Sequence, residues 1–420
     1  MSIRVAVTGY GLITPFGKGE RVALQAIYEG RHAFRDIRGF DTSRTFAKRG
    51  AEAPLADRSY RDFADYCVRE AMRMAKLSPG HELMSDAAVA VGNLGDGAIQ
   101  EAYYRQYAGD SQAERLPGDR GHNRPTDGGQ PAALRESFSG GWCGQPISIR
   151  DSIPSRHADE IARTIGSSGV RLAYTNACVA SANAIGYGYD QIRFGRTSCA
   201  IVGGINVIHP KVYYNFDSSR AMADDVVRPF SKDRSGLLIG DGAAILVLES
   251  LDAALRRGAR PLAEIVGWGV SSDGFHVSQP DPEGRGLARA MRMALRKAGL
   301  APQHIHYVNA HGTGTPLNDR SETKALKEVF GRDAGNVPVS STKSMTGHML
   351  EATGAVEAAF SMMALLSQRI PPTANYAGPE EGLDLDYVTE GARDIPLTYV
   401  MSNSSAFGGN NCSLIFRRVG

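Results

Sequence analysis

Hydrophobic and polar positions along this 420-residue chain follow two alternating patterns. Short apolar runs bounded by glycine or polar residues are typical of strands, and the continuous ones predict strands buried on both faces of a parallel sheet. Longer segments with apolar residues three or four positions apart predict amphipathic helices. We expect strands at 3–8, 87–91, 170–174, 198–207, 243–248, 262–270, 305–309, 338–341, 387–388, 399–402 and 413–417, and helices at 20–30, 59–77, 179–194, 250–261, 285–300, 320–330 and 351–368.

Strands and helices alternate in two halves that echo one another. Each half has a strand, a reactive-looking residue and a helix rich in alanine and glycine, and that residue is Cys178 in the first half and His348 in the second. Such alternation predicts an α/β fold with mostly parallel sheets. The charged helix at 250–261 separates the halves, so we place the domains at residues 1–255 and 256–420. Packing of the two small-residue helices would bring both turns together at the centre.

Two glycine-rich stretches interrupt this pattern. Gly9–Pro15 follows the first strand and predicts a turn, but its glycines lack the GxGxxG spacing of a dinucleotide-binding loop. Residues 108–131 are polar, rich in glycine and proline, and without period, so we expect a long loop. That loop is either a lid or partner surface, or a disordered insertion.

Composition and charge exclude several classes of protein. With 42% apolar and 22% charged residues the chain is ordinary globular protein, and a net charge of +2 argues for neither nucleic acid nor a membrane surface as partner. The first residues read as a strand rather than a signal peptide, and no apolar run approaches membrane-spanning length. The five cysteines lack CxxC pairs, so we expect neither zinc nor disulfides, and a reduced, cytoplasmic location; they are Cys67, Cys143, Cys178, Cys199 and Cys412.

Cys178 stands at a strand-to-helix turn. The strand ends before Asn176, and the helix that follows runs to a stop at Gly195. At a helix N-terminus the dipole and free backbone N–H groups favour a thiolate and can hold an oxyanion. A buried structural cysteine fits the same pattern, because a free cysteine packs as a small hydrophobic residue. Taken alone, this stretch leaves the two interpretations equally open.

Three further loops place polar groups between strands and glycines. His311 is flanked by Gly312 and Gly314, whose backbones allow close approach of a ligand, while His348 follows Lys343 by five residues. The third loop, Phe407–Gly409, follows a strand near the C-terminus. One cysteine, two histidines and a lysine would suit a nucleophile with its base. A set of unrelated core residues is the alternative.

Together these segments resemble the β-ketoacyl-ACP synthases, the condensing enzymes of the thiolase fold, and most of all the elongating ketosynthases of type II fatty acid and polyketide systems. The resemblance runs from residue 3 to about 417 and is weakest between 95 and 145. It implies two duplicated βαβαβαββ-type halves that form a five-layer αβαβα sandwich. The segments that carry it are Val5–Pro15, Asn176–Cys178, Arg228–Ala243, Asn309–Asp319, Lys343–His348 and Phe407–Gly409.

The resemblance implies a role for each reactive residue. Cys178 would take an acyl chain from the phosphopantetheine of acyl carrier protein (ACP) as a thioester. Malonyl-ACP would then lose CO2, and the resulting carbanion would attack the thioester to give β-ketoacyl-ACP. Backbone N–H groups of Cys178 and Phe407 would form the oxyanion hole, and His311 and His348 would stabilise the enolate. Lys343 would order His311 and the acidic residues rather than react.

Further residues enter only through this resemblance. Asp319, Glu322 and Glu357 would form the supporting acidic network. Asn309, Glu357, Ser402 and Asn403 match positions that hold a structural monovalent cation in some relatives, and a buried polar network is the alternative. No tightly bound cofactor is implied, since phosphopantetheine arrives on the carrier protein.

The chain departs from the family pattern near the expected pocket. Val179 follows the nucleophile where relatives carry alanine, serine or threonine. Ser405 and Ala406 replace an aromatic residue and a glycine of the gate, which comprises residues 405–409, and Gly to Ala restricts φ. Ser235 and Leu237 replace an aspartate and a phenylalanine. With the insertion at 108–131, these changes lead us to expect an unusual acyl substrate, as in a secondary-metabolite polyketide pathway.

Two other functions stay open at this point. A thiolase acting on coenzyme A would need a second reactive cysteine near the C-terminus, for which Cys412 is the only candidate. A chain-length-factor-like subunit would be catalytically silent, but such subunits typically lack the nucleophile that Cys178 provides.

The resemblance also implies protein partners. An acidic ACP would dock on basic residues at the pocket mouth, for which Arg58, Arg61, Arg220 and, less favoured, Arg193 are candidates; each could equally belong to a solvated basic face. The chain would form a homodimer, or a heterodimer with a chain-length-factor-like subunit.

Overall fold

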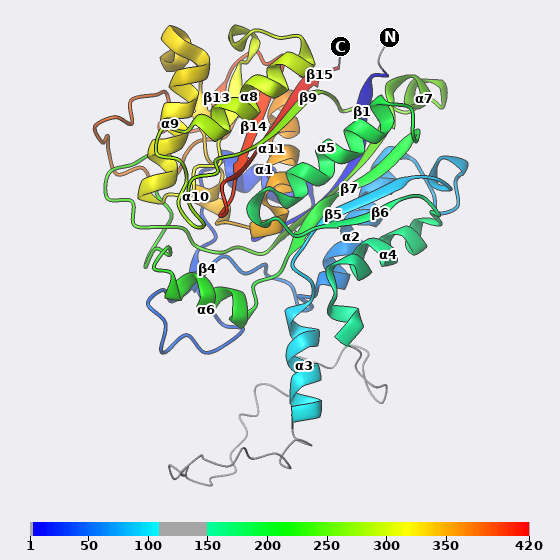
Figure 1. Ribbon diagram of the computed structural model, residues 1–420, viewed down its shortest axis with the longest axis horizontal. Coiled ribbons are helices and arrows are strands. Elements are labelled where there is room, and N and C mark those ends of the chain that lie inside the picture. The colour runs from blue at the N-terminus through cyan, green and yellow to red at the C-terminus, as the bar shows by residue number, and fades with distance from the viewer. Residues whose placement is uncertain (1–2, 109–148, 420) are drawn as a thin grey trace.

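The computed structural model describes residues 3–108 and 149–419. Apart from Ala108, which ends a helix, the loop predicted at 108–131 lies outside the described residues, as does Cys143. Two sets of five strands run through the molecule (Figure 1). In the first half the order is β1 (Val5–Thr14), β8 (Gly242–Ser250), β7 (Cys199–Asn206), β5 (Ala88–Gly92) and β6 (Arg171–Tyr174). In the second it is β9 (Ala263–Ser272), β15 (Asn410–Arg418), β14 (Tyr399–Ser405), β10 (Tyr307–Asn309) and β11 (Val339–Ser340).

The two halves are joined where Val5–Val7 of β1 pairs antiparallel with Ala263–Ile265 of β9. The described sheet is mixed, and the prediction of mostly parallel sheets was wrong. Strands β6, β5 and β7 run parallel, as do β14, β10 and β11, whereas β8, β1, β9 and β15 pair antiparallel. Antiparallel pairs arise where a short turn, rather than a helix, connects two neighbouring strands, as between β14 and β15.

Helices lie on both sides of these strands and between them. Helices α5 (Ala180–Arg193) and α11 (Thr353–Ser367) form the central layer and contact strands of both halves. On one outer face lie α2 (Tyr60–Ala75) and α4 (Pro154–Ile165), and on the other α8 (Arg285–Ala298) and α9 (Pro316–Phe330). This confirms the expected α/β sandwich of five layers. The other main elements are α1 (Glu20–Tyr28), β2 (Gly17–Lys18), β3 (Arg35–Asp36), β4 (Arg49–Gly50), α3 (Gly97–Ala108), α6 (Pro210–Ser218), α7 (Leu251–Arg256), α10 (Lys343–Thr346), β12 (Arg369–Ile370) and β13 (Arg393–Asp394).

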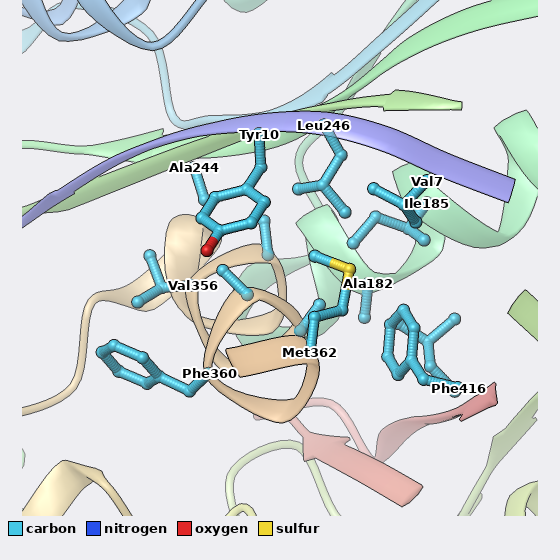
Figure 2. Packing of buried hydrophobic residues seen from close by; sticks show 14 of the residues in the cluster. Val7, Tyr10, Ala182, Ile185, Ala244, Leu246, Val356, Phe360, Met362 and Phe416 are labelled. Atoms are coloured by element: carbon cyan, nitrogen blue, oxygen red, sulfur yellow. The ribbon is translucent and has the colours of Figure 1, made fainter. Parts of the chain in front are cut away.

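The central core is the packing of α5 and α11 against the strands. Small residues let the two helices approach closely: a Cβ added at Gly354 would lie 2.7 Å from the Ala182 backbone nitrogen. Figure 2 shows how larger side chains of the strands and of the two helices themselves fill this central layer. They include Val7, Tyr10, Leu246, Ile185, Val356, Phe360 and Phe416. The domain boundary between residues 255 and 256 remains our proposal; it falls at the last residue of α7, before β9 begins at Ala263.

Two predicted elements were wrong. Gly9–Pro15 is not a turn, because β1 continues to Thr14 with a register shift between Val7 and Gly9. Its glycines serve close packing: a Cβ at Gly9 would lie 2.2 Å from the Ala71 carbonyl oxygen of α2. Residues 387–388 form no strand, since Val388 has a left-handed φ of 51° that turns the chain. In the described ranges no helix is long and apolar enough to cross a membrane.

Candidate active site

Cys178 lies at the junction of β6 and α5. A single 3₁₀ turn, η4 (Ala177–Val179), connects the strand to the helix, and Ala177 has a left-handed φ of 57°. A non-glycine residue in this region costs about 1–3 kcal/mol and is often found at functional sites. The turn places the Cys178 thiol at the N-terminal end of α5, where it is 6% exposed. Val179, the first departure from the family pattern, is fully buried in the central core.

The thiol is not an activated thiolate in this state. Burial, followed by the charge of Glu351, raises the pKa of Cys178 to about 12, and the positive charge of Lys343 offsets only part of this. Burial therefore opposes the thiolate that the helix N-terminus was expected to favour, because a charged sulfur is costly away from water. In this state the thiol keeps its proton at neutral pH.

A slow alkylation of Cys178 at neutral pH follows from this pKa. The thiolate is the reactive form, and its fraction grows tenfold per pH unit below the pKa. We expect the rate of iodoacetamide labelling at Cys178, followed by peptide mass spectrometry, to rise about tenfold per unit from about pH 7 to pH 9. The labelling rate of a small free thiol in the same tube should level off above about pH 8.5. Levelling of Cys178 near neutrality would show an activated thiolate and contradict the burial argument.

His311 is held by its backbone. It follows β10, and Glu322 of α9 accepts the backbone N–H groups of His311 (2.9 Å to Oε1) and Gly312 (2.8 Å to Oε2). Gly312 has a φ of 34°, and a Cβ there would lie 2.5 Å from the Ser341 Cβ, so the close turn requires glycine. Asp319 secures the next turn of the loop by accepting the Gly314 N–H at 3.3 Å.

His348 comes from the other histidine loop and is fixed in one tautomer. Its backbone N–H donates to the Leu238 carbonyl at 2.7 Å, and Gly347 before it has a φ of 70°. The ring atom Nδ1 accepts the backbone N–H of Leu350 at 3.0 Å. Since Nδ1 of the neutral ring is an acceptor, the proton is on Nε2. Thr353 lies 3.0 Å from the same Nδ1. His348 can therefore donate a hydrogen bond from Nε2.

The structure brings Cys178, His311 and His348 together. The thiol sulfur and one ring nitrogen of each histidine lie within 4.8 Å of one another. The two imidazole rings meet edge to face with centroids 5.2 Å apart. Burial, and then the charge of Lys343, lower the pKa of both histidines well below the ordinary value, so both rings are neutral at physiological pH. Two neutral imidazoles beside a thiol are hydrogen-bond donors for a developing oxyanion.

Lys343 bonds one of the three acidic residues that were expected around it. Its Nζ is fully buried and donates to Glu357 Oε1 of α11 at 2.5 Å, with no hydrogen bond to Glu322 or Asp319 among the described residues. Burial raises the pKa of Glu357 to about 7. Glu322 instead fixes the His311 loop, and burial raises its pKa to about 7 as well. Lys343 acts on the histidines through its charge.

The residues expected to hold a cation are only partly suited to it. Asn309 and Ser402 are register partners on β10 and β14. Asn309 Oδ1 and Glu357 Oε2 are buried and have no hydrogen-bond partner within the described chain, so both could face a cation or a water molecule. The side chain of Asn403 is engaged elsewhere, because Ser413 donates to its Oδ1 and its Nδ2 contacts the Met291 sulfur. Asn403 is therefore less suited than Asn309 and Glu357, because one lone pair of its Oδ1 is already used.

The gate residues form the turn between β14 and β15. Gly408 and Gly409 have left-handed φ values of 84° and 74°, which is why two glycines are needed. Ala406 has no such conformation, so its Cβ adds no strain. Ser405 donates to Asn411 Oδ1 at 2.8 Å. The Phe407 ring is 42% exposed and stacks on Phe216 of α6, with centroids 5.7 Å apart.

The segment Arg228–Gly240 of the first half supports both histidine loops of the second, a role that sequence reasoning did not find. The Phe230 N–H donates to Asp319 Oδ2 at 2.7 Å, and Leu238 and Gly240 bond the backbone of His348. Within this segment Leu237 is buried, whereas Ser235 is exposed. The resemblance to the family pointed to this segment but not to its role, because its contacts join the two halves and cannot be predicted from local sequence.

Cys412, the other candidate nucleophile, lies in β15 within the central core. Burial raises its pKa to about 12. It does not belong to the group of close Cys and His atoms found among the described residues. The structure thus places Cys412 as a core residue.

The fold and the site define a class of protein. A buried thiol with two neutral imidazoles, between two α/β halves packed on central helices, is the arrangement of a thiolase-fold condensing enzyme. The models of the β-ketoacyl synthase N-terminal and C-terminal domains match residues 2–254 and 262–377. The chain belongs to the β-ketoacyl synthase family.

Curated relatives and solved structures agree with this assignment. The chain is 36% identical to a 3-oxoacyl-[acyl-carrier-protein] synthase 2 of Synechocystis, over 99% of this chain and 98% of the relative. It also resembles the ishigamide ketosynthase/chain length factor, with a TM-score of 0.86, 32% identity and full coverage of both chains. A type II polyketide ketosynthase bound to a hexaketide and in complex with its acyl carrier protein gives a TM-score of 0.87 at 26% identity, again with full coverage of both chains.

Proposed function

We propose that this chain is a β-ketoacyl-ACP synthase, which condenses a Cys178-bound acyl chain with malonyl-ACP and releases CO2. The observation that carries this proposal is the meeting of Cys178, His311 and His348 within 4.8 Å. The Nε2–H tautomer of His348 adds the chemistry, because a hydrogen-bond donor held in place stabilises a developing enolate oxygen.

In the first half-reaction the Cys178 sulfur attacks the thioester of acyl-ACP. The new carbon–sulfur bond forms as the bond to phosphopantetheine breaks, and the proton of the buried thiol passes to the leaving phosphopantetheine sulfur. The backbone N–H groups of Cys178 and Phe407 would hold the negative charge on the carbonyl oxygen.

In the second half-reaction malonyl-ACP loses CO2. The electron pair left behind becomes an enolate, whose thioester oxygen would accept hydrogen bonds from His311 and His348. The enolate carbon attacks the Cys178 thioester, a carbon–carbon bond forms, and the Cys178 sulfur leaves and takes up a proton. Burial, and then the charge of Lys343, keep both imidazoles neutral, so each would act as an uncharged hydrogen-bond donor.

The acyl substrate is proposed to be unusual, as in a type II polyketide or other secondary-metabolite pathway. Support comes from the altered gate at Ser405 and Ala406 and from Val179 beside the nucleophile. The similarity to the ishigamide ketosynthase/chain length factor and to a type II polyketide ketosynthase adds to it. The free, buried thiols of Cys67, Cys178, Cys199 and Cys412 in the described chain support a reducing, cytoplasmic location.

A silent chain-length-factor-like subunit and a thiolase are weaker alternatives. Assembly of a complete Cys-His-His set speaks against the first. The position of Cys412 in the core, outside that set, speaks against the second.

A protein partner is proposed at the edge of the first half. Strand β6 pairs only with β5 in the described sheet, so its outer edge has unpaired backbone groups. Val170, which directly precedes β6, is 51% exposed. The partner would be a second copy of this chain or a chain-length-factor-like subunit. The native mass of the chain purified alone distinguishes them, because only a homodimer would have twice the mass of one chain.

Of the arginines considered for carrier docking, Arg220 is the best placed. Arg58 is a structural residue, because it is paired with Glu52 and the buried Asp241. Arg193 lies at the far end of α5, about 20 Å along the helix from Cys178. Arg220 is exposed after α6, the helix whose Phe216 stacks on Phe407. Arg61 is exposed at the start of α2.

Reversal of charge at Arg220 should therefore weaken carrier binding. We expect Arg220→Glu to raise KM for acyl-ACP about fivefold or more at low salt, and by less at high salt, since screening weakens steering. Arg193→Glu is the matched control and should leave KM unchanged. Equal effects of the two variants would show that the whole basic surface, rather than the mouth, attracts the carrier.

The direct test of the proposed function is acyl transfer to the purified protein. Incubation with octanoyl-ACP and other acyl-ACPs should add one acyl mass at Cys178, and malonyl-ACP should then release it as β-ketoacyl-ACP. A protein that accepts no acyl chain at Cys178 would contradict the proposal.

A further inference from the structure

A glutamate occupies, in the second half, the place that Cys178 has in the first. A 3₁₀ turn, η7 (Leu350–Ala352), precedes α11 just as η4 precedes α5. The residue before Cys178 and the residue before Glu351 both have left-handed φ values, 57° for Ala177 and 43° for Leu350. The duplicated halves therefore present Cys178 and Glu351 from equivalent turns.

The two turns lie side by side. Residues of η4 and η7 are in contact, and the first turns of α5 and α11 are bonded where Ala355 N–H donates to Ser181 Oγ at 2.9 Å. Glu351 is close enough to Cys178 for its charge to act on the thiol, second only to burial. The glutamate thus stands beside the nucleophile, from the opposite half of the molecule.

Glu351 is buried with one carboxyl oxygen unpartnered. The residue is 2% exposed, and Oε2 has no hydrogen-bond partner anywhere in the described ranges. Burial raises the pKa of Glu351 to about 7. Buried polar atoms are nearly always hydrogen-bonded in native proteins. The proposed half-reactions give this carboxyl no role.

A second unpartnered group, His157, lies against a tyrosine on which the charge of Glu351 acts. Tyr60, the first residue of α2, has Glu351 as its strongest charged neighbour and bonds the backbone of Val207, just past the end of β7, the strand that contacts η7. The Tyr60 ring stacks on that of His157 with centroids 5.3 Å apart. His157 of α4 is 3% exposed, and neither of its ring nitrogens has a partner in the part of the chain that the structure describes. Burial lowers the pKa of His157, so the ring is neutral.

We propose that Glu351, Tyr60 and His157 form a polar subsite beside Cys178 that hydrogen-bonds a hydroxyl group carried by the Cys178-linked acyl chain. A neutral imidazole offers one donor and one acceptor. A protonated carboxyl group does the same, and an ionised one offers acceptors only. A hydroxyl group on the acyl chain can donate to one of these side chains and accept from another, whereas a saturated chain would leave both side chains unpaired. The inference rests on the proposed function and specifies its substrate class.

The test is acylation of Cys178 in competition. The full-length protein receives equimolar octanoyl-ACP and a monohydroxylated octanoyl-ACP, one positional isomer at a time, and intact mass spectrometry reads which acyl group Cys178 carries. We expect at least one hydroxylated isomer to be preferred about tenfold, the size of one good hydrogen bond.

Three variants locate the preference. Glu351→Leu and His157→Phe should each reduce it to about twofold or less, and His157→Phe retains the ring stack with Tyr60 if Glu351→Leu fails to fold. Tyr10→Phe is the matched control, because it removes another buried hydroxyl (Figure 2), one whose acidic neighbour is Glu20 rather than Glu351, and should leave the preference intact.

The outcomes separate the subsite from the function. Acylation without preference for any hydroxylated isomer would overturn the subsite and leave the ketosynthase activity standing. A preference that survives both Glu351→Leu and His157→Phe would also overturn it. If no acyl chain is transferred to Cys178, the proposed function fails and the subsite falls with it.

Discussion

Replacement of Cys178 by alanine is expected to abolish both acyl transfer and condensation. The thioester to Cys178 is the intermediate that both half-reactions share, so its loss should lower the condensation rate by at least about 10³-fold. Cys178 sits in a strained turn rather than filling a large core space, so the variant should fold normally. The measurement is product formation from acyl-ACP and malonyl-ACP, with circular dichroism as a check of the fold.

Cys412→Ala is the matched control for this variant. Both cysteines are buried thiols whose pKa is raised to about 12, so an effect of burial alone would be common to them. Only Cys178 lies with the two histidines. Loss of activity in both variants would favour thiolase-type chemistry with two cysteines.

The second large effect is expected at His348. His348→Ala removes the Nε2–H donor to the enolate, and loss of one oxyanion donor typically costs about 10²–10³-fold in rate. Transfer of the acyl chain to Cys178 does not form this enolate and should be nearly unchanged. Stopped-flow measurement of CO2 release from malonyl-ACP, alongside intact mass of the acyl-enzyme, separates the two steps. Equal loss in both steps would mean that His348 is the base for the thiol instead.

The neutral state of the two histidines also sets the pH dependence of condensation. Burial lowers the pKa of His311 and His348 well below the ordinary value near 6.5, so their neutral form is present above that lowered pKa and is lost only at more acidic pH. CO2 release should therefore stay flat between about pH 8 and pH 6. A decrease centred near about pH 6.5 would show imidazoles that titrate normally.

Sequence reasoning was most successful where local pattern and chemistry coincide. The strand, turn and small-residue helix around Cys178 are all local features, and the structure contains each of them. The glycines beside His311 were marked as points of close approach, and Gly312 indeed leaves no room for a Cβ.

The errors concern contacts made across the fold. Gly9 and Gly11 resemble turn glycines locally, but they allow β1 to lie against the backbone of α2. The partner of Lys343 is Glu357, one helix later, and sequence spacing gave no reason to prefer it to Glu322. Glu351 was read as part of an alanine-rich helix, because only the packing of the two halves places it beside Cys178.

The most direct test of the account is a single turnover of the acyl-enzyme. Protein carrying one acyl group on Cys178 is isolated, mixed with malonyl-ACP, and both proteins are followed by intact mass. The account predicts that the acyl mass leaves Cys178 at the rate at which ACP gains a β-ketoacyl chain two carbons longer, with one CO2 released for each. Product that forms while Cys178 keeps its acyl group, or release of the acyl group as free acid without product, would contradict it.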